Sequence, residues 1–454
     1  MNSIRSLKFA AAALLLCLVA SVASAKPAFR GDDRSRRDPG EVLTRGPVHE
    51  AFAEAVVLDP EPSVLVPESP PEAIEEIPPD ERPDGDNIAW IPGYWAWDLG
   101  QRGYVWISGV WRAIPPGREW VPGYWSRTDG GYRWVAGYWA DLRSQEVTYL
   151  PEPPDTIDEG PNIPAPADDY IWVPGSWVWH HGRYAWRPGY WIRGQRDWMY
   201  VPSHYVWSPR GYVYSDAYWD YDLERRGVLF APVYFEPEVY HRRHFSYSPT
   251  VVINLFGFVS NLFLRPRDCH YYVGDYYDDG YYRQGFLPAY EVRSYRVAYD
   301  PVFVHERFVH RGDRDWDRHY ERDFDDRRRN PDRRPPRTFE AMRGLASRGQ
   351  GSSLDRGLAM ATTLKQFTSR SGATGSATGS GSLASAFNFR KVAENDRKSF
   401  AQKGQDLIKS IGERRQLEST SAVKPVTAAV APFGSMEMLF NPACCLPFGR
   451  TDKS

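Results

Sequence analysis

The sequence predicts a mainly β protein, in which short strands rich in Trp, Gly and Pro form an antiparallel meander in two blocks. Three observations predict this fold class. Aromatic residues make up 15% of the 454 residues, and 37 Gly and 38 Pro supply turns. Seventeen of the 18 tryptophans fall between Trp90 and Trp219 and recur periodically. Stretches such as Tyr104-Val105-Trp106-Ile107 alternate as strands do.

Residues 1–25 have the features of a secretory signal peptide. Arg5 and Lys8 precede an apolar run, and Ala23-Ser24-Ala25 forms a small-residue cleavage site. The run is shorter than the roughly 20 apolar residues that a spanning helix needs. We therefore expect an exported mature chain with no membrane span, located in the periplasm, the cell envelope or outside the cell.

Cleavage would remove Cys17 and leave Cys269, Cys444 and Cys445 in the mature chain. An odd number of cysteines in an oxidising compartment leaves the disulfide state open.

Residues 26–87 are acidic and proline-rich, with ten acidic residues and one basic residue between Asp59 and Asp86. Such a composition predicts an extended, disordered and solvated segment. A second acidic, proline-rich linker spans residues 143–169. Its Ile157-Asp158-Glu159 matches Ile74-Glu75-Glu76 of the first segment. The chain is therefore predicted to be a duplication of a linker followed by Trp repeats.

The repeat unit is W-x-x-G-x-W, and it occurs six times in strict form. The first block, residues 88–142, contains four strict copies, and the second block, residues 170–235, contains two strict copies and then decayed ones. The strict copies are Trp90–Trp95, Trp106–Trp111, Trp120–Trp125, Trp134–Trp139, Trp172–Trp177 and Trp186–Trp191. Their central glycines, the expected structural residues of the repeat, are Gly93, Gly109, Gly123, Gly137, Gly175 and Gly189.

A strand of about nine residues and a turn of about five would fill the common 14-residue spacing. Strict alternation along that strand places Trp106 and Trp111 on opposite faces, and the central glycine leaves room for a neighbouring indole. The alternative is a type II turn at Val121-Pro122-Gly123-Tyr124. Both alternatives give an antiparallel meander.

At these residues the chain resembles the bacterial W-x-x-G-x-W (YXWGXW-type) repeat proteins, a family of exported chains. The resemblance covers about 150 residues of the chain, where six strict copies occur. It implies an envelope or secreted location and supplies no catalytic residue.

The remaining segments are assigned from composition and periodicity. We expect a Tyr/Phe-rich β region at 236–304, a mixed-charge segment at 305–338, a low-complexity linker at 339–385, an amphipathic helix at 386–418 and a flexible tail at 419–454.

Groups that could carry chemistry are few. His241 and His244 with Cys269-His270 form the best candidate metal cluster, but their spacing matches no known zinc pattern. His180-His181 lies at an expected hairpin turn, and Asp168-Asp169 lies in a linker that cannot fix two carboxylates for glycoside cleavage. We therefore expect no enzyme activity, no catalytic residue, no metal and no cofactor. The net charge of −2 gives no field for binding nucleic acid.

Two functions fit the sequence. The first is a structural or scaffolding role in the cell envelope, with cell-envelope proteins as partners and the indoles buried. The second is a carbohydrate or cell-wall binding module, in which exposed aromatic faces stack on the sugar rings of a polysaccharide. The candidate stacking residues are Trp95, Trp111, Trp125, Trp139, Trp177 and Trp191. The sequence leaves the oligomeric state open.

Overall fold

The computed structural model describes residues 40–144, 146–292, 298–347, 358–371, 387–419 and 426–429. The expected signal peptide, residues 26–39, Cys444 and Cys445 lie outside these residues. The described chain is rich in strands, and their pairs are antiparallel except for one parallel pair, β4 (Glu75–Glu76) with β25 (Ser246–Tyr247). The predicted mainly β, antiparallel fold class is confirmed.

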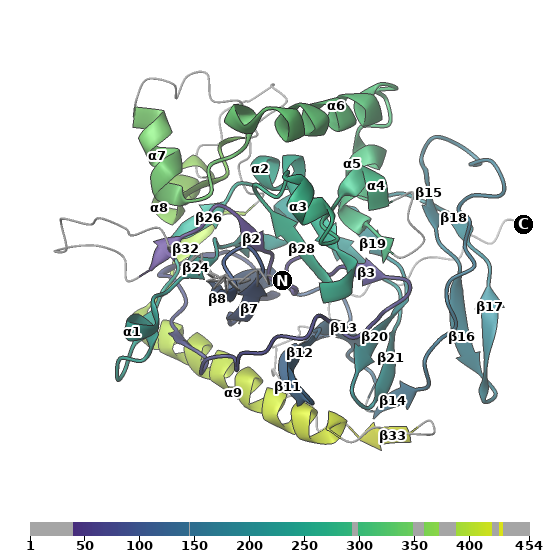
Figure 1. Ribbon diagram of the computed structural model, residues 1–454, viewed down its shortest axis with the longest axis horizontal. Coiled ribbons are helices and arrows are strands. Elements are labelled where there is room, and N and C mark those ends of the chain that lie inside the picture. Colours follow the sequence, from purple (N-terminus) through teal and green to yellow (C-terminus); the bar gives the residue numbers. More distant parts are fainter. Residues whose placement is uncertain are drawn as a thin grey trace, which may run out of the picture. The chain divides into compact units, whose positions relative to one another are not determined.

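Four long hairpins lie between residues 88 and 221 (Figure 1). Each hairpin pairs two repeat copies, and each arm consists of two short strands separated by two residues. Hairpin 1 contains β6 (Ile88–Ile91), β7 (Tyr94–Asp98), β8 (Gly103–Ile107) and β9 (Val110–Ala113). Hairpin 2 contains β10 (Arg118–Val121), β11 (Tyr124–Thr128), β12 (Gly131–Val135) and β13 (Tyr138–Asp141). Hairpin 3 contains β15 (Tyr170–Val173), β16 (Ser176–His180), β17 (Arg183–Arg187) and β18 (Tyr190–Arg193). Hairpin 4 contains β19 (Trp198–Val201), β20 (His204–Ser208), β21 (Gly211–Ser215) and β22 (Tyr218–Tyr221).

The two residues between the short strands form a gap in the ladder, not a reversal of the chain. In hairpin 2, Trp120 lies opposite Trp139 on one side of the gap, and Trp125 lies opposite Trp134 on the other. The register is therefore the same on both sides of Pro122-Gly123. The continuous-strand interpretation gives the correct chain direction, whereas a type II turn at this point is wrong. The same arrangement recurs in the other three hairpins.

Further strands extend the hairpins at their edges. β23 (Gly227–Leu229) pairs with β9, and β24 (Val233–Tyr234) joins β8 to β1 (Glu41–Val42). β14 (Glu146–Leu150) lies between β21 and β33 (Val426–Ala429). The expected linker at 143–169 thus includes a strand, and this strand of the linker contributes to a sheet of the second block.

The acidic segment from residue 40 onward is also ordered, which corrects the expectation of a solvated spacer. Phe52 and Val56 are fully buried in the main hydrophobic core. Glu50, Glu54 and Glu76 are buried too, because they accept hydrogen bonds from the hairpins. Composition predicted solvation because it takes no account of such partners. The remaining short strands of this segment are β2 (Gly46–Pro47), β3 (Val56–Val57) and β5 (Glu81–Pro83).

Short strands and helices alternate after the hairpins. The strands are β26 (Val251–Ile253), β27 (Leu262–Arg265), β28 (His270–Val273), β29 (Leu287–Pro288), β30 (Ala298–Tyr299), β31 (Ala361–Thr363) and β32 (Phe389–Lys391). The short helices are α1 (Pro237–Tyr240), α2 (Leu255–Ser260), α3 (Asp279–Tyr282) and α4 (Ala289–Val292). The region at 236–304 therefore combines the expected strands with short helices.

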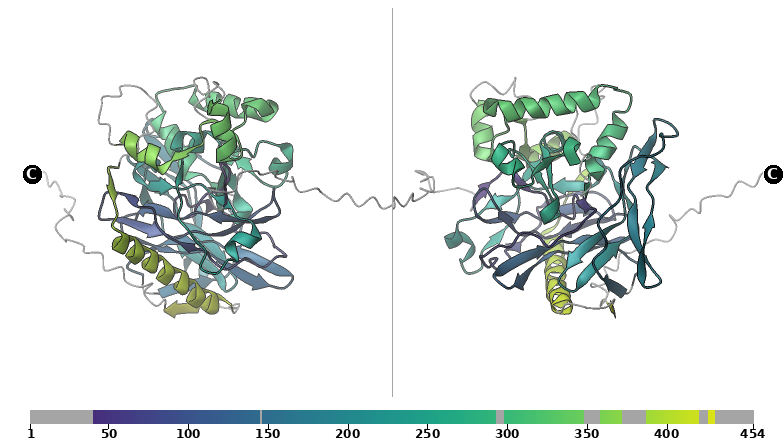
Figure 2. Two further views of the ribbon diagram at one scale, coloured as in Figure 1. Left: turned by 90° about the vertical axis from the view of Figure 1, so that its left-hand side faces the viewer. Right: turned by 45° about the vertical axis from the view of Figure 1, so that its right-hand side comes forward.

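The longer helices are α5 (Pro301–Val309), α6 (Trp316–Arg329), α7 (Phe339–Ser347), α8 (Leu364–Ser371) and α9 (Glu394–Glu418). Of these helices, α5 and α9 pack on hairpin strands, whereas α7 contacts β1 and α8 contacts β26 and β31. α5 contacts β15 and β19, and hairpin 3 lies beside the green helical segment (Figure 2). α9 lies within the expected helical segment and runs past β6 and β11 (Figure 1). Within the described residues, no helix is both long enough and apolar enough to cross a bilayer.

Candidate functional site

A buried carboxylate occupies the gap of hairpin 1. Glu76 accepts hydrogen bonds from the backbone N–H of Gly93 at 2.8 Å, from that of Gly109 at 3.0 Å and from the Trp106 Nε1 at 3.1 Å. Burial raises the pKa of Glu76 to about 7, although the three hydrogen bonds favour the charged form. In the gap, therefore, buried backbone N–H groups donate to a carboxylate instead of to a carbonyl of the opposite strand.

Hairpins 2 and 3 hold a carboxylate in the same way. Glu50 accepts from the Trp134 Nε1 at 2.8 Å and from the Gly137 N–H at 3.0 Å. In hairpin 3, Asp158 accepts from the Gly175 N–H at 2.5 Å. Each hairpin built from strict copies thus receives one carboxylate at its gap.

Hairpin 4 lacks the repeat glycines, and its carboxylate is held by side chains. Ser203 and Ala217 occupy the glycine positions. Glu54 accepts a hydrogen bond from the Tyr218 hydroxyl at 2.7 Å and lies 3.2 Å from His204 Nε2. Hairpin 4 therefore also contacts a buried carboxylate, but the donors are side chains instead of gap N–H groups.

The repeat glycines allow an indole of the opposite arm to cross the gap. A Cβ atom on Gly93 would lie 2.1 Å from the Ile107 carbonyl oxygen and 2.8 Å from the Trp106 ring. At the other five repeat glycines, a Cβ atom would lie 2.3–2.6 Å from a tryptophan ring; these are Gly109, Gly123, Gly137, Gly175 and Gly189. Side chains larger than hydrogen do not fit at these positions.

Indoles on both sides of the gap meet at the same carboxylate. Trp106 donates to Glu76, and the ring of Trp90 adjoins Gly109, whose N–H also donates to Glu76. Trp90 is the cross-strand partner of Trp111. The prediction that Trp106 and Trp111 lie on opposite faces is therefore wrong, because the two-residue gap breaks strict alternation.

Three of the six candidate stacking tryptophans are not available to a ligand. Trp95 is 4% exposed, and Trp111 and Trp139 are fully buried. They are covered because the segment from residue 40, the strands after the hairpins and α9 pack on hairpins 1 and 2. The other three candidates are half-buried: Trp125, Trp177 and Trp191. Hairpin 3 thus has the more accessible indoles.

The other sequence candidates do not form a reactive site. His270 is buried and lies 3.4 Å from Glu50. His241, the C-cap of α1, and His244, which follows it, are exposed. Among the described residues, no group of His, Cys, Asp and Glu could hold a metal ion. His180 and His181 are exposed at the turn of hairpin 3.

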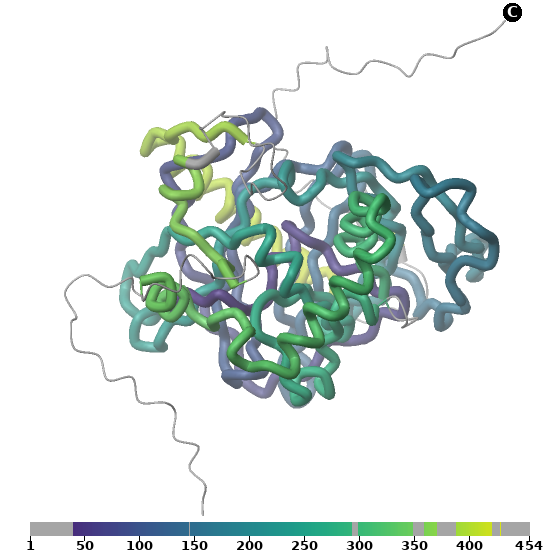
Figure 3. The backbone as a smooth tube through the Cα atoms, turned by 90° about the horizontal axis from the view of Figure 1, so that it is seen from above, coloured from purple at the N-terminus to yellow at the C-terminus, as the bar shows by residue number. Residues whose placement is uncertain are grey.

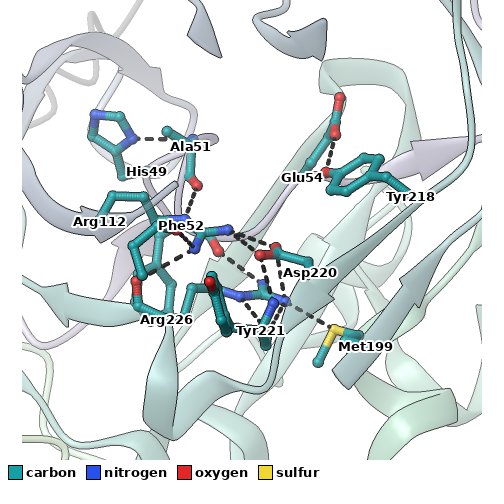
Figure 4. A network of polar contacts seen from close by, with 11 residues as sticks. His49, Ala51, Phe52, Glu54, Arg112, Met199, Tyr218, Asp220, Tyr221 and Arg226 are labelled. Carbon is teal, nitrogen blue, oxygen red and sulfur yellow. Dashed lines mark hydrogen bonds and ion pairs between the residues drawn. The ribbon is translucent and has the colours of Figure 1, made fainter. Parts of the chain in front are cut away.

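A polar network lies deep inside the fold (Figure 4). Arg112 of hairpin 1 and Arg226 both pair with Asp220 of hairpin 4, at 2.5 and 3.0 Å. The same arginines donate to the backbone carbonyls of Ala51 and Phe52. Because all three charged side chains are buried, a ligand cannot reach them, and the network serves to join two hairpins to the N-terminal segment.

A groove that the sequence analysis did not predict lies beside hairpin 3. The groove encloses about 1130 Å³, and its walls include Trp172 and Trp191 of the hairpin and Phe308 and Trp316 of the helical segment. Figure 3 shows hairpin 3 in blue beside these green helices. Helix α5 and hairpin 3 are more than 100 residues apart in sequence, so periodicity within either one could not predict the groove between them.

These features define a class of protein: a β-hairpin repeat protein in which paired Trp/Gly motifs hold carboxylates. The WXXGXW repeat model matches residues 89–112, 120–140 and 168–191, which correspond to hairpins 1, 2 and 3. The chain thus contains WXXGXW repeats, as the sequence resemblance indicated. No curated protein and no solved structure matches the chain.

Proposed function

We propose that the protein is a non-enzymatic structural or scaffolding component of the cell envelope, exported by its N-terminal segment. The observation that supports this proposal is that the buried carboxylates contact the hairpins of the fold itself. Glu50, Glu54 and Glu76 hold hairpins in place, and Asp220 joins two hairpins. A catalytic carboxylate would have to face a substrate, whereas these stabilise the scaffold.

Cell fractionation tests the location. We expect the full-length chain to be processed and to appear in the envelope fraction, and a variant lacking residues 2–25 to stay in the cytoplasm. A full-length chain that is unprocessed and cytoplasmic would overturn the proposed location. If the protein is a scaffold of the envelope, loss of the gene should sensitise cells to detergent. The wild-type chain should restore resistance, and a Glu76→Ala chain should not.

A carbohydrate or cell-wall binding role is a second candidate, and the half-buried indoles of hairpin 3 favour it. Trp172 and Trp191 line the groove, where aromatic faces could stack on sugar rings. Retention of the full-length chain on insoluble polysaccharide or purified cell wall tests this role. Retention that is lost in Trp191→Ala but kept in Trp139→Phe, which alters a buried indole, would support it. Equal retention of both variants would count against it.

A further inference from the structure

Two acidic, proline-rich segments of the chain lie on two hairpins in the same way. The segments are Glu68–Glu76 on hairpin 1 and Pro151–Glu159 on hairpin 3. Their sequences align as Pro70-Pro71-Glu72-Ala73-Ile74-Glu75-Glu76 with Pro153-Pro154-Asp155-Thr156-Ile157-Asp158-Glu159. Neither forms regular helix or strand before its acidic end, as expected for proline-rich chain that leaves its carbonyls free to accept hydrogen bonds.

Equivalent donors of the two hairpins bind equivalent atoms of the two segments. The Trp95 Nε1 donates to the Glu72 carbonyl at 2.8 Å, and the Trp177 Nε1 donates to the Asp155 carbonyl at 2.9 Å. Trp95 and Trp177 are the second tryptophans of their repeat copies, and Glu72 and Asp155 align. A shared side chain alone would be weak evidence, but both the donor and the acceptor positions correspond.

The contacts at the two ends of the segments also correspond. The Tyr104 hydroxyl donates to the Glu68 carbonyl at 2.7 Å, and the Tyr184 hydroxyl donates to the Pro151 carbonyl at 2.5 Å. Each tyrosine lies two residues before a repeat tryptophan. At the other end, N–H groups of the gap bind an acid that lies 17 residues before the glycine in both cases: Glu76 for Gly93 and Asp158 for Gly175. In the alignment Asp158 corresponds to Glu75, so at this end the two segments share the distance to the glycine and differ by one residue in which of the two acids binds.

We propose that a WXXGXW hairpin is a recognition module for acidic, proline-rich peptide segments, and that hairpin 3 can accept such a segment from a partner protein. Tyr and Trp side chains donate hydrogen bonds to the carbonyls of the extended peptide, and the gap N–H groups bind one of the two acids at its end. The mode resembles the docking of proline-rich peptides on aromatic grooves. The two internal segments indicate the chemistry of the partner: two prolines, an acid, an isoleucine and two further acids.

Hairpin 3 is the exchangeable module because its own segment is loosely seated. Ile74 of the first segment is 5% exposed, whereas the aligned Ile157 is 54% exposed. Glu76 accepts from both gap glycines and the Trp106 indole, whereas Asp158 divides its two oxygens between the Gly175 N–H of the gap and the Gly160 N–H of its own segment. A partner segment that buries its isoleucine and directs its acid fully at the gap can displace residues 151–159.

Binding of the peptide Val66–Glu76 to the full-length chain tests this inference. We expect saturable binding by fluorescence anisotropy, and binding at least about tenfold tighter to the Asp158→Ala chain, which removes the internal acid that the Gly175 N–H binds. Trp177→Phe keeps the ring but removes the Nε1 donor, and it should weaken binding about tenfold. Trp198→Phe in hairpin 4 is the matched control and should bind like the wild type.

Two further measurements keep the result clear. A peptide with Gln in place of Glu75 and Glu76 should bind at least about tenfold more weakly, and near-ultraviolet circular dichroism should show that each variant is folded. The inference is overturned if the folded Asp158→Ala chain shows no saturable binding, or if Trp177→Phe binds as tightly as Trp198→Phe. It does not depend on the cellular location, so fractionation results leave it unaffected.

Discussion

At the scale of single residues, the repeat depends on one carboxylate for each hairpin. Glu76 satisfies two backbone N–H groups and one indole that would otherwise be buried without a partner. Burial without hydrogen bonds costs about 1–3 kcal/mol for each such group. The acids in the proline-rich segments are therefore part of the fold.

Replacing Glu76 by Ala should destabilise the protein by about 3 kcal/mol or more, because three buried donors lose their acceptor. Urea denaturation measures the free energy of unfolding. Glu75→Ala is the matched control, because Glu75 is exposed, and it should change stability by less than about 0.5 kcal/mol. Similar losses in the two variants would contradict the assigned role of Glu76.

The raised pKa of Glu76 predicts how stability depends on pH. Its pKa is about 7 in the folded protein against an ordinary value of 4.5, so the folded chain binds a proton that the unfolded chain has released. This contribution is complete below about pH 4.5 and is lost as pH rises through about 7. Burial raises the pKa values of Asp300 to about 6 and of Glu306 to about 7, with the same sign.

We therefore expect the free energy of unfolding to fall between about pH 5 and about pH 8, and to fall less in Glu76→Gln. Urea denaturation of both chains at the two pH values measures the difference. An equal fall in the two chains would show that Glu76 does not take up a proton in this range.

At the scale of elements, the hairpin gap explains the spacing of the motif. The motif's glycine lets an indole cross the gap, and the tryptophans lie opposite one another in pairs. The sequence predicted the antiparallel strands and the space made by the glycines, because alternation and glycine content are local properties. It could not predict that Glu76 and Asp158 enter the gaps, since no local pattern links an acid to a glycine 17 residues away.

Gly93→Ala should cost more than about 2 kcal/mol, because its Cβ would lie 2.1 Å from the Ile107 carbonyl oxygen. Gly103→Ala is a control within the same hairpin, since a Cβ atom there has no other atom within 4 Å. Thermal unfolding of both variants measures the effect. The steric role of Gly93 would be refuted by equal melting temperatures.

Helix α9 is attached to hairpin 2 through an ion pair, in which Glu418 also accepts a hydrogen bond from the Tyr124 hydroxyl at 2.8 Å. Arg414 Nη1 donates to the carbonyls of Pro122 and Ala136, at 2.7 and 3.1 Å, and its Nε pairs with Glu418 at 3.0 Å. Both carbonyls belong to the ladder gap. The gap thus offers N–H groups to an acid and carbonyls to a cation.

Arg414→Ala should destabilise the protein by about 3–5 kcal/mol, because Glu418 would be left buried without its cation. Arg415→Ala alters the neighbouring exposed arginine and should change stability by less than about 0.5 kcal/mol. Urea denaturation compares the two. If Arg414→Ala is as stable as its neighbour variant, α9 does not depend on this ion pair.

At the scale of the whole molecule, the hairpins depend on chain outside the repeats. Glu50 and Glu76 come from the segment before hairpin 1, and Arg414 comes from α9 near the other end. We expect a fragment of residues 88–235 to lack cooperative unfolding, and a fragment of residues 40–429 to retain it. Urea denaturation and near-ultraviolet circular dichroism test both. Cooperative unfolding of the shorter fragment would show that the hairpins are self-sufficient.

The sequence by itself determined the repeat, its antiparallel strands, the glycine at the gap and the helical character of residues near 386–418. These depend on periodicity and on steric rules that act over a few residues. The tertiary structure alone decided which indoles are buried, which acids enter the gaps and where the groove lies. Those outcomes depend on contacts between residues far apart in the sequence, such as Arg414 with Pro122 and Arg397 with Pro78, and no local pattern encodes them.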